Sequence, residues 1–309
     1  MATERIVTRT VIGAQLQTVR QLGLSHEVME YTTLNQALNE PTIIDLLPNP
    51  MTQGMEIADE YDYTKDTENL YTQYVVLGNG GHRNIDNPND AVPYTLPIPH
   101  LATDTGLFNL MAFLVRPVTD DLTPAEREKY RLRRTVMRDG VLYAAYFARK
   151  IDFPRTTPDM NITTIVDGEE SSEQFVPTIN NLRPSHPEES HNYDGAYASV
   201  SSYVQLVWDS NEIADIKEAA RILFGNERMA IISEIAICSG VEKPVKQRYP
   251  NSGAQVPTVA PANMFFEAVA CQVQVHITTY VPISFVDQEY KLSLDIGATE
   301  PLFGVTVNG

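Results

Sequence analysis

The chain lacks the features of disulfide-stabilised and membrane-spanning proteins. It has only two cysteines, Cys238 and Cys271, and each lies in an apolar, strand-like run. This placement predicts two buried free thiols made in a reducing compartment, and no disulfide framework. No stretch approaches the roughly 20 apolar residues that a membrane helix needs. The first residues, Met1 to Arg5, carry no signal-peptide pattern. We therefore expect synthesis in a cytoplasm and a soluble product.

Positive charge is also scarce. The sequence has 40 acidic and 23 basic side chains, a formal net charge of −17. A general nucleic-acid-binding protein needs cations to neutralise phosphates, and adsorption to anionic membranes needs them too. The balance therefore argues against nucleic acid and membranes as partners. It favours charge-complementary docking to a basic protein surface.

The usual catalytic and metal-binding motifs are missing as well. Residues 78–81 are rich in glycine but are followed by His82 and Arg83, whereas a phosphate-binding loop needs Lys and then Ser or Thr. A tight turn or bulge is favoured there. His186 and His191 flank two glutamates, but a zinc site needs further ligands at compatible positions. No Gly-x-Ser-x-Gly elbow occurs. We predict no catalytic residue, no metal, no cofactor and no enzyme.

The segment 55–70 is acidic and leaves two interpretations open. Its side chains include Glu56, Asp59, Glu60, Asp62, Asp66 and Glu68, interleaved with Tyr61 and Tyr63. A calcium-binding loop is the first interpretation. An EF-hand loop requires a central glycine, however, and the stretch from Asp62 to Glu68 has none. A solvated acidic loop is therefore favoured.

A β-hairpin is predicted at residues 130–152. Asp139-Gly140 is a strong two-residue turn signal, because both central positions of a type I′ turn need a positive φ. A short helix is expected just upstream. Thr123 can cap it, a proline suits its first position, and Glu126 completes a capping box.

The hairpin carries most of a basic island. Nine of the 23 basic residues fall between Arg116 and Lys150. Three interpretations are open: nucleic-acid binding, a solvated face, or pairing with acidic surface on a second copy or another protein. The third is favoured, since arginine makes bidentate contacts with carboxylates. It predicts that arginine-to-glutamate changes impair assembly and leave the isolated fold intact. The predicted interface residues are Arg127, Arg131, Arg133, Arg134 and Arg138.

Hydrophobic periodicity predicts the other elements. The clearest helix is residues 209–224, with a cap at Asp209 or Ser210 and Gly225 after its end. Residues 265–286 alternate and predict a half-buried strand with one apolar and one polar face. The remaining predictions are strands within 4–20, strands at 74–77 and 203–208, a strand or helix at 228–238, a loop at 241–261, and strands at 290–294 and 303–307. Residues 33–47 are ambiguous, since their apolar spacing suits a short helix that Pro41 interrupts.

These elements predict a mainly β (α+β) fold, with antiparallel sandwich-like sheets, a few short helices and long Pro-rich loops. A β-rich domain is expected at residues 1–155. Residues 156–199 are rich in Pro, Ser, Asn, Asp and Glu, which predicts an extended insertion arm that contacts neighbours. Residues 200–309 are expected to form a second β-rich domain that packs on the first.

Several short motifs resemble structural proteins of tailed bacteriophages. They lie at residues 78–83, 97–100, 108–109, 113–117, 120–122, 129–133 and 297–303. The layout is similar to a β-rich, dimer-forming baseplate wedge subunit of contractile-tailed phages. The resemblance covers about the middle quarter of the chain and its end. These motifs are not catalytic, so the resemblance carries over no functional residue.

The resemblance implies a structural subunit of a phage tail, in the virion baseplate. Its expected partners are copies of the same chain, as a dimer within a ring, and neighbouring tail proteins. A neck or head–tail connector protein is the alternative. The rival class is a metal- or carbohydrate-binding tail module or enzyme. Its candidate site is the group Asp59, Glu60 and Asp62, or the loop with His186 and His191.

Overall fold

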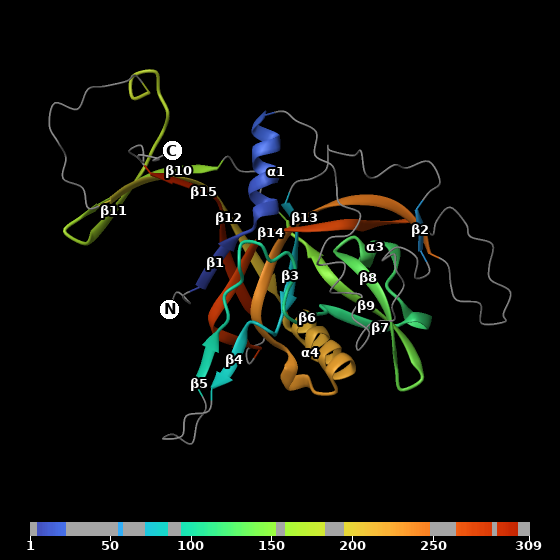
Figure 1. The fold of residues 1–309 in the computed structure, drawn as a ribbon. Helices are drawn as coiled ribbons and strands as arrows, with labels where there is room; N and C mark the ends of the chain where they lie inside the picture. Colours follow the sequence, from blue (N-terminus) through green and yellow to red (C-terminus); the bar gives the residue numbers. More distant parts are fainter. Residues whose placement is uncertain are drawn as a thin grey trace. The chain divides into compact units, whose positions relative to one another are not determined.

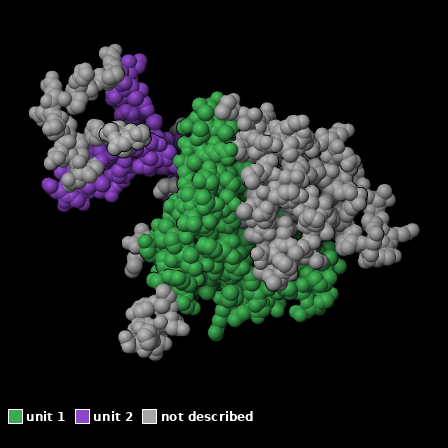
Figure 2. Space-filling view, viewed as in Figure 1, with its two compact units in different colours: residues 1–151, 208–290 green, residues 152–207, 291–309 purple. Residues whose placement is uncertain are grey.

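The structure is a computed structural model that describes residues 5–22, 55–57, 72–85, 94–152, 158–182, 195–247, 264–285 and 289–301. Over these residues the protein is mainly β, with antiparallel sheets, which confirms the predicted fold class. The chain forms two compact units, coloured separately in Figure 2. Unit 1 is residues 1–151 and 208–290, and unit 2 is residues 152–207 and 291–309.

Unit 1 is built around a nine-stranded antiparallel sheet (Figure 1). Its strands are β1 (Arg5–Arg9), β2 (Met55–Ile57), β3 (Thr72–Gly78), β6 (Leu110–Met111), β7 (Leu114–Pro117), β8 (Tyr130–Arg138), β9 (Val141–Lys150), β13 (Ile231–Gln247) and β14 (Met264–Ser284). The main path has the order β1-β14-β13-β3-β9-β7, while β2 pairs with β13, β6 with β3 and β8 with β9. A separate pair joins β4 (His82–Ile85) to β5 (Tyr94–Pro97).

The two longest strands, β13 and β14, pair with each other along most of their length. Strand β13 continues to Gln247, so the first part of the predicted loop at 241–261 is strand. The prediction of a single buried face for β14 is wrong. Gln272, His276 and Thr278, on the predicted polar face, are each only 1% exposed. The chain at residues 98–104 covers this face, where His276 and Thr278 hydrogen-bond the backbone oxygens of Asp104 and Ile98.

The N-terminal segment corrects a second prediction. Only Arg5–Arg9 of the segment 4–20 is a strand, and Val11–Leu22 forms the helix α1. Thr10 ends the strand and caps the helix: its Oγ1 accepts a hydrogen bond from the Gly13 N–H at 2.9 Å. Gly13 also lets the helix approach β14 closely, because a Cβ at that position would lie 2.6 Å from the backbone oxygen of Gln274.

The other helices of unit 1 begin and end at the predicted signals. Helix α3 (Pro124–Arg127) has the reciprocal capping box of Thr123 and Glu126. Helix α4 (Ser210–Phe224) has a second one, between Asp209 and Glu212, and ends at Gly225 with φ 76°. The described residues of the unit also include two 3-10 turns, η2 (Val118–Asp120) and η3 (Glu227–Met229). The predicted hairpin is confirmed as β8 and β9, with Asp139 at φ 50° and Gly140 at φ 77° in its turn.

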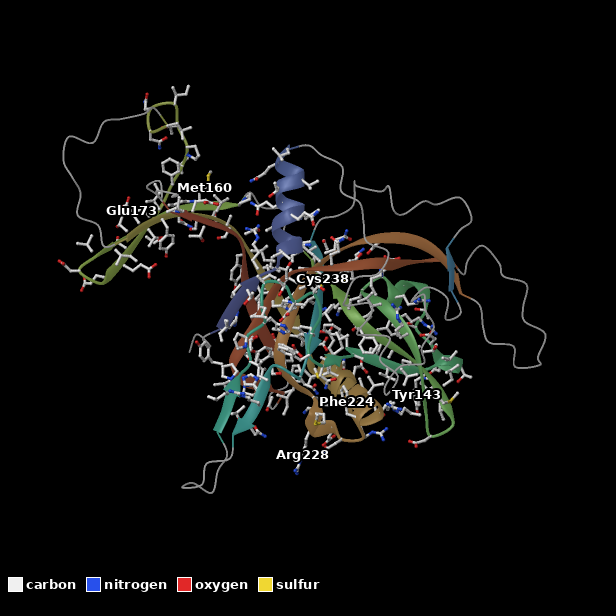
Figure 3. The ribbon with its side chains drawn as sticks, in the orientation of Figure 1. Tyr143, Met160, Glu173, Phe224, Arg228 and Cys238 are labelled. Carbon is white, nitrogen blue, oxygen red and sulfur yellow. The ribbon has the colours of Figure 1, made fainter. Side chains whose placement is uncertain are left out.

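The main core cluster joins the large sheet to α4. Phe147 of β9 and Leu223 of α4 are among its buried members, and Tyr143 and Phe224 pack against it (Figure 3). Burying one such side chain contributes about 1.5–3 kcal/mol. Cys238 and Cys271 lie in the same cluster as free, buried cysteines, as predicted.

Unit 2 contains a four-stranded sheet with the order β11-β10-β12-β15. Its strands are β10 (Asp159–Val166), β11 (Glu169–Gln174), β12 (Gly195–Trp208) and β15 (Tyr290–Pro301). Asp167-Gly168 turns the first hairpin with φ values of 52° and 78°. The prediction of an extended arm at residues 156–199 is therefore wrong, because the described part of this segment contains two complete strands and the start of a third.

The structure also divides the C-terminal half differently from the predicted domain 200–309. Residues 208–290 belong to unit 1, because β13 and β14 pair with β3 and β1. Residues 291–309 belong to unit 2, where β15 pairs with β12. The predictions for residues 33–47, 58–70, 183–194 and 302–309 lie outside the described residues. Among the described helices, none is long and apolar enough to cross a membrane.

Candidate functional site

The predicted interface arginines lie inside unit 1. Arg127, Arg131, Arg133 and Arg134 are each no more than 3% exposed, while Arg138 is partly exposed. They project from α3 and β8 towards acidic groups and backbone oxygens of the same chain. A surface for a second protein cannot be made from side chains that are already covered, so this prediction is wrong for the four buried arginines.

Arg133 and Asp121 form a buried ion pair. Nε and Nη2 of Arg133 donate to Asp121 Oδ2 at 2.9 and 2.7 Å, and the Tyr146 hydroxyl donates to Oδ1 at 2.6 Å. Burial disfavours the charged carboxylate, but the Arg133 charge and these hydrogen bonds hold the pKa of Asp121 below its ordinary value. The pair fixes strand β8 to the segment that precedes α3.

Arg131 forms a second network with Glu242 of β13. Its Nε and Nη2 donate to the two carboxylate oxygens at 3.1 and 3.3 Å, and Nη1 donates to the backbone oxygen of Arg127 at 2.7 Å. The Tyr74 hydroxyl and the Lys150 ammonium also donate to Glu242. Burial raises the pKa of Glu242, but Arg131 and the hydrogen bonds outweigh it, so the pKa stays below its ordinary value.

The rest of the basic island holds α4 against the sheet. Lys129 and Arg149 both pair with Glu212 in the first turn of α4, the latter at 3.4 Å, and Arg116 pairs with Asp215 at 2.8 Å. At the other end of the helix, Arg138 Nη2 donates to the backbone oxygen of Leu223 at 3.3 Å. Cations near a helix C-terminus are stabilising. The island thus links β7, β8 and β9 to α4 within one chain.

A further polar centre forms around Glu234, a fully buried residue of β13. Its Oε2 accepts hydrogen bonds from His100 Nε2 at 2.8 Å and the Phe108 N–H at 3.0 Å. Its Oε1 accepts from the N–H groups of Asn109 at 2.9 Å and Gly80 at 3.0 Å. Four donors therefore satisfy the carboxylate, as a buried charge requires. This arrangement joins three of the motifs on which the phage resemblance rests.

The glycine-rich run at residues 78–81 is explained by the same centre. A Cβ at Gly78 would lie 2.5 Å from Glu234 Oε1, and one at Gly81 would lie 2.7 Å from the backbone oxygen of Ser233. Neither glycine has a positive φ. The run therefore provides room for close packing between β3 and β13, rather than a special turn conformation.

Two histidines stack beside Glu234. The ring of His100 lies between those of Phe108 and His276, at centroid distances of 4.2 and 3.9 Å. His276 Nε2 donates to the backbone oxygen of Asp104 at 3.1 Å, so the neutral ring carries its proton on Nε2. Burial, with a smaller contribution from His100, lowers the pKa of His276 to about 4. The carboxylate and the stacked rings anchor the segment 98–109 on the sheet.

The key residue of this centre, Glu234, was missed at the level of sequence. A signal for it exists: Glu234 is the single charged residue within the apolar run from Met229 to Cys238. A lone charge in a buried strand requires a partner. The sequence does not say which partner, because residues 80, 100 and 108–109 are all distant from Glu234 along the chain.

Unit 2 presents a different kind of surface. Side chains alternate along a strand, so every second residue of β10 shares one face with its opposite residues on β12. This face carries Met160, Ile162, Val166, Ala196, Ala198 and Val200, which we call the apolar strip, and Thr164 interrupts it between Ile162 and Val166. Val166 and Val200 are 45% and 42% exposed. Glu169 and Glu173 of β11 border the same face, and Figure 3 labels Met160 and Glu173 on this hairpin.

The metal-binding version of the rival class can be compared with the described residues. Within these ranges, no group of three or more His, Cys, Asp or Glu side chains is arranged to hold a metal ion. The candidates Asp59, Glu60 and Asp62, and the pair His186 and His191, lie outside the described residues. Their predicted roles stay predictions.

The fold and its polar centres define a mainly β protein with a nine-stranded sheet and a smaller, four-stranded unit. Comparison with protein families adds one assignment. Residues 52–308 match a model described as a family of unknown function (DUF7208), and the chain belongs to this family. Neither the curated proteins nor the solved structures yielded a match.

Proposed function

We propose that the protein is a structural subunit of a phage tail, which assembles with copies of itself and with neighbouring virion proteins. The observation that carries this proposal is the apolar strip on the unit 2 sheet. A sheet normally buries one face against a second layer. Here Val166 and Val200 stay exposed in the single chain. An apolar face bordered by carboxylates suits a contact with another protein.

The position in the tail rests on the phage resemblance, which favours the baseplate. Three of its motifs, at residues 78–83, 97–100 and 108–109, supply groups around Glu234 or next to it. In this proposal these motifs stabilise the structure of the subunit and take no part in a reaction. The ion pairs of the basic island act in the same way, because they make unit 1 a rigid support.

Fractionation of purified particles tests the proposal. The phage whose genome encodes this chain is separated into heads and tails, and each fraction is analysed by quantitative mass spectrometry. We expect several copies per tail. Detection in heads alone would move the protein to the head–tail connector. Absence from every particle fraction would contradict a virion role altogether.

A further inference from the structure

A turn at the end of the β11 strand exposes three large aliphatic side chains. Val176, Ile179 and Leu182 are 62%, 79% and 62% exposed. The turn is ordered by its own hydrogen bonds: the Thr178 N–H donates to Asn181 Oδ1 at 2.6 Å, and the Leu182 N–H donates to the Thr178 oxygen at 3.1 Å. Single exposed aliphatic residues are normal, but a fixed group of three marks an interaction site. We call residues 175–182 the apolar tip.

The unit that carries the apolar tip is unusually acidic. Its 75 residues, 152–207 and 291–309, contain 11 acidic and 3 basic side chains, a net charge of −8 out of −17 for the whole chain. Strand β11 alone contributes three glutamates, and all six of its residues are exposed. Nearly half of the net charge thus lies on about a quarter of the residues. Such a field attracts a basic partner and repels a second acidic copy.

A hollow on the β10–β11 hairpin indicates which kind of side chain such a partner would insert into it. It has a volume of about 470 Å³ and is lined by Thr164, Val166, Asp167, Glu169, Glu170 and Ser171. Glu169 shares the face of Thr164 and Val166, whereas the Glu170 carboxylate accepts a hydrogen bond from the Tyr197 hydroxyl at 2.5 Å on the opposite face of the sheet. An aliphatic wall beside carboxylates suits a lysine or arginine, whose stem is apolar and whose end is charged.

We propose that the apolar tip and the hollow form one docking surface for another protein. The contact surface of that protein has an apolar socket surrounded by basic side chains. Three strand residues, about 10 Å of extended chain, separate the two features. That span suits a protein interface of ordinary size. The proposal deepens the proposed function and rests on it, since it names the surface by which the subunit joins its neighbour.

The occupant is a different protein rather than a second copy. Unit 2 of a second copy carries the same net charge of −8, so two copies of this surface repel one another. The cluster of arginines in the basic island does not offer that basic surface either, since Arg127, Arg131, Arg133 and Arg134 are buried within unit 1. A basic neighbour supplies the charge that this chain lacks.

Site-specific photo-crosslinking in purified particles tests the surface. A benzophenone amino acid replaces Ile179 in the full chain, and a control chain carries it at Met137, which is 51% exposed in unit 1. We expect an adduct at position 179 with a different virion protein, at a peptide rich in Lys and Arg, and at least tenfold less adduct from position 137. Adducts only with a second copy, or equal yields at both positions, would overturn the proposal.

Incorporation of two matched variants separates this surface from the general function. Ile179→Asp removes the central aliphatic side chain and adds a charge, whereas Asn180→Asp adds the same charge next to it. We expect Ile179→Asp to reduce incorporation at least tenfold and Asn180→Asp to reduce it less than twofold. If wild-type chain is present in particles and Ile179→Asp enters equally well, the docking surface is wrong and the virion role stands. If wild-type chain is absent from particles, both proposals fail.

Discussion

Unit 1 and unit 2 treat charged side chains in opposite ways. Unit 1 buries arginines and carboxylates and gives them partners in the same chain, as in the pair of Arg133 and Asp121. Unit 2 leaves its carboxylates in water and its aliphatic side chains uncovered, as at Ile179. Unit 1 thus neutralises many of its charges within the chain, whereas the carboxylates of β11 in unit 2 remain available to another molecule.

This difference shows that a charge-rich segment of sequence does not by itself identify a binding surface. The basic island of residues 116–150 and the acidic strand β11 both resemble binding surfaces in sequence. Arginines in a strand that packs between buried elements become buried with it. Carboxylates from distant segments then form ion pairs with them. Glutamates in a strand at the edge of a small sheet stay in water, since nothing in the described chain covers them.

The largest expected effect comes from breaking a buried ion pair in unit 1. Arg133→Leu leaves Asp121 charged and buried without its partner, which should lower the free energy of unfolding by about 3–5 kcal/mol. Urea titration followed by the fluorescence of Trp208, the single tryptophan, reports on unit 1. The control Arg83→Leu, at an exposed position, should change it by less than about 0.5 kcal/mol.

A double variant sharpens the same test. Arg133→Leu combined with Asp121→Leu removes both charges, so roughly 1–2 kcal/mol of the loss should return. Equal stability of the wild type and Arg133→Leu would show that the pair is not buried in solution.

The second-largest expected loss of stability comes from the polar centre around Glu234. Glu234→Gln places an amide N–H₂ against groups that are themselves donors, so we expect a loss of about 2–4 kcal/mol. Amide hydrogens of residues 98–109 should also exchange faster, since their anchor is weakened. Glu227→Gln, at an exposed position of η3, is the matched control. Unchanged exchange at residues 98–109 would contradict the anchoring role.

The stability of unit 1 should depend on pH through His276. Its pKa falls from 6.5 to about 4 on folding, so the unfolded chain binds more protons between these values. The contribution of His276 to the free energy of unfolding is therefore fully present above about pH 6.5. It declines by up to about 3 kcal/mol as the pH falls to about 4, and below that pH it no longer changes. Urea titrations from pH 4.5 to 7 should show this slope, and His276→Gln should flatten it. A slope retained in His276→Gln would assign it to another group.

The smallest expected effect on stability lies in unit 2. Ile179→Asp changes an exposed residue, so the thermal midpoint of the free chain should move by an amount equivalent to less than about 0.5 kcal/mol. Circular dichroism melting measures it. A loss comparable to that of Arg133→Leu would show that the apolar tip is part of a folded core, and the contrast between the units would fail.

Local signals in the sequence predicted much of unit 1. Asp139-Gly140 located the hairpin turn, the capping box at Thr123 located one helix, and the cap predicted at Asp209 or Ser210 located another. The same turn signal, Asp167-Gly168, was present in unit 2. The arm was predicted from composition alone, and the strand that follows this turn is entirely polar and exposed, so it shows no alternation that predicts a strand.

The polar centres could not be predicted in the same way. Whether Arg133 is exposed or buried depends on Asp121 and Tyr146, and whether Arg131 is buried depends on Glu242, 111 residues away. Periodicity describes one strand at a time, whereas these contacts arise from the order of strands in the sheet. The polar face of β14 was misjudged for this reason, since its cover comes from residues 98–104.

Hydrogen–deuterium exchange of the full chain, free and within purified particles, tests the contrast between the two units most directly. The account predicts that residues 158–182 of unit 2 exchange at least tenfold more slowly in the particle, while residues 130–150 of unit 1 exchange at the same rate in both states. Unchanged exchange over residues 158–182, with new protection over residues 130–150, would contradict it and return the interface to the basic hairpin.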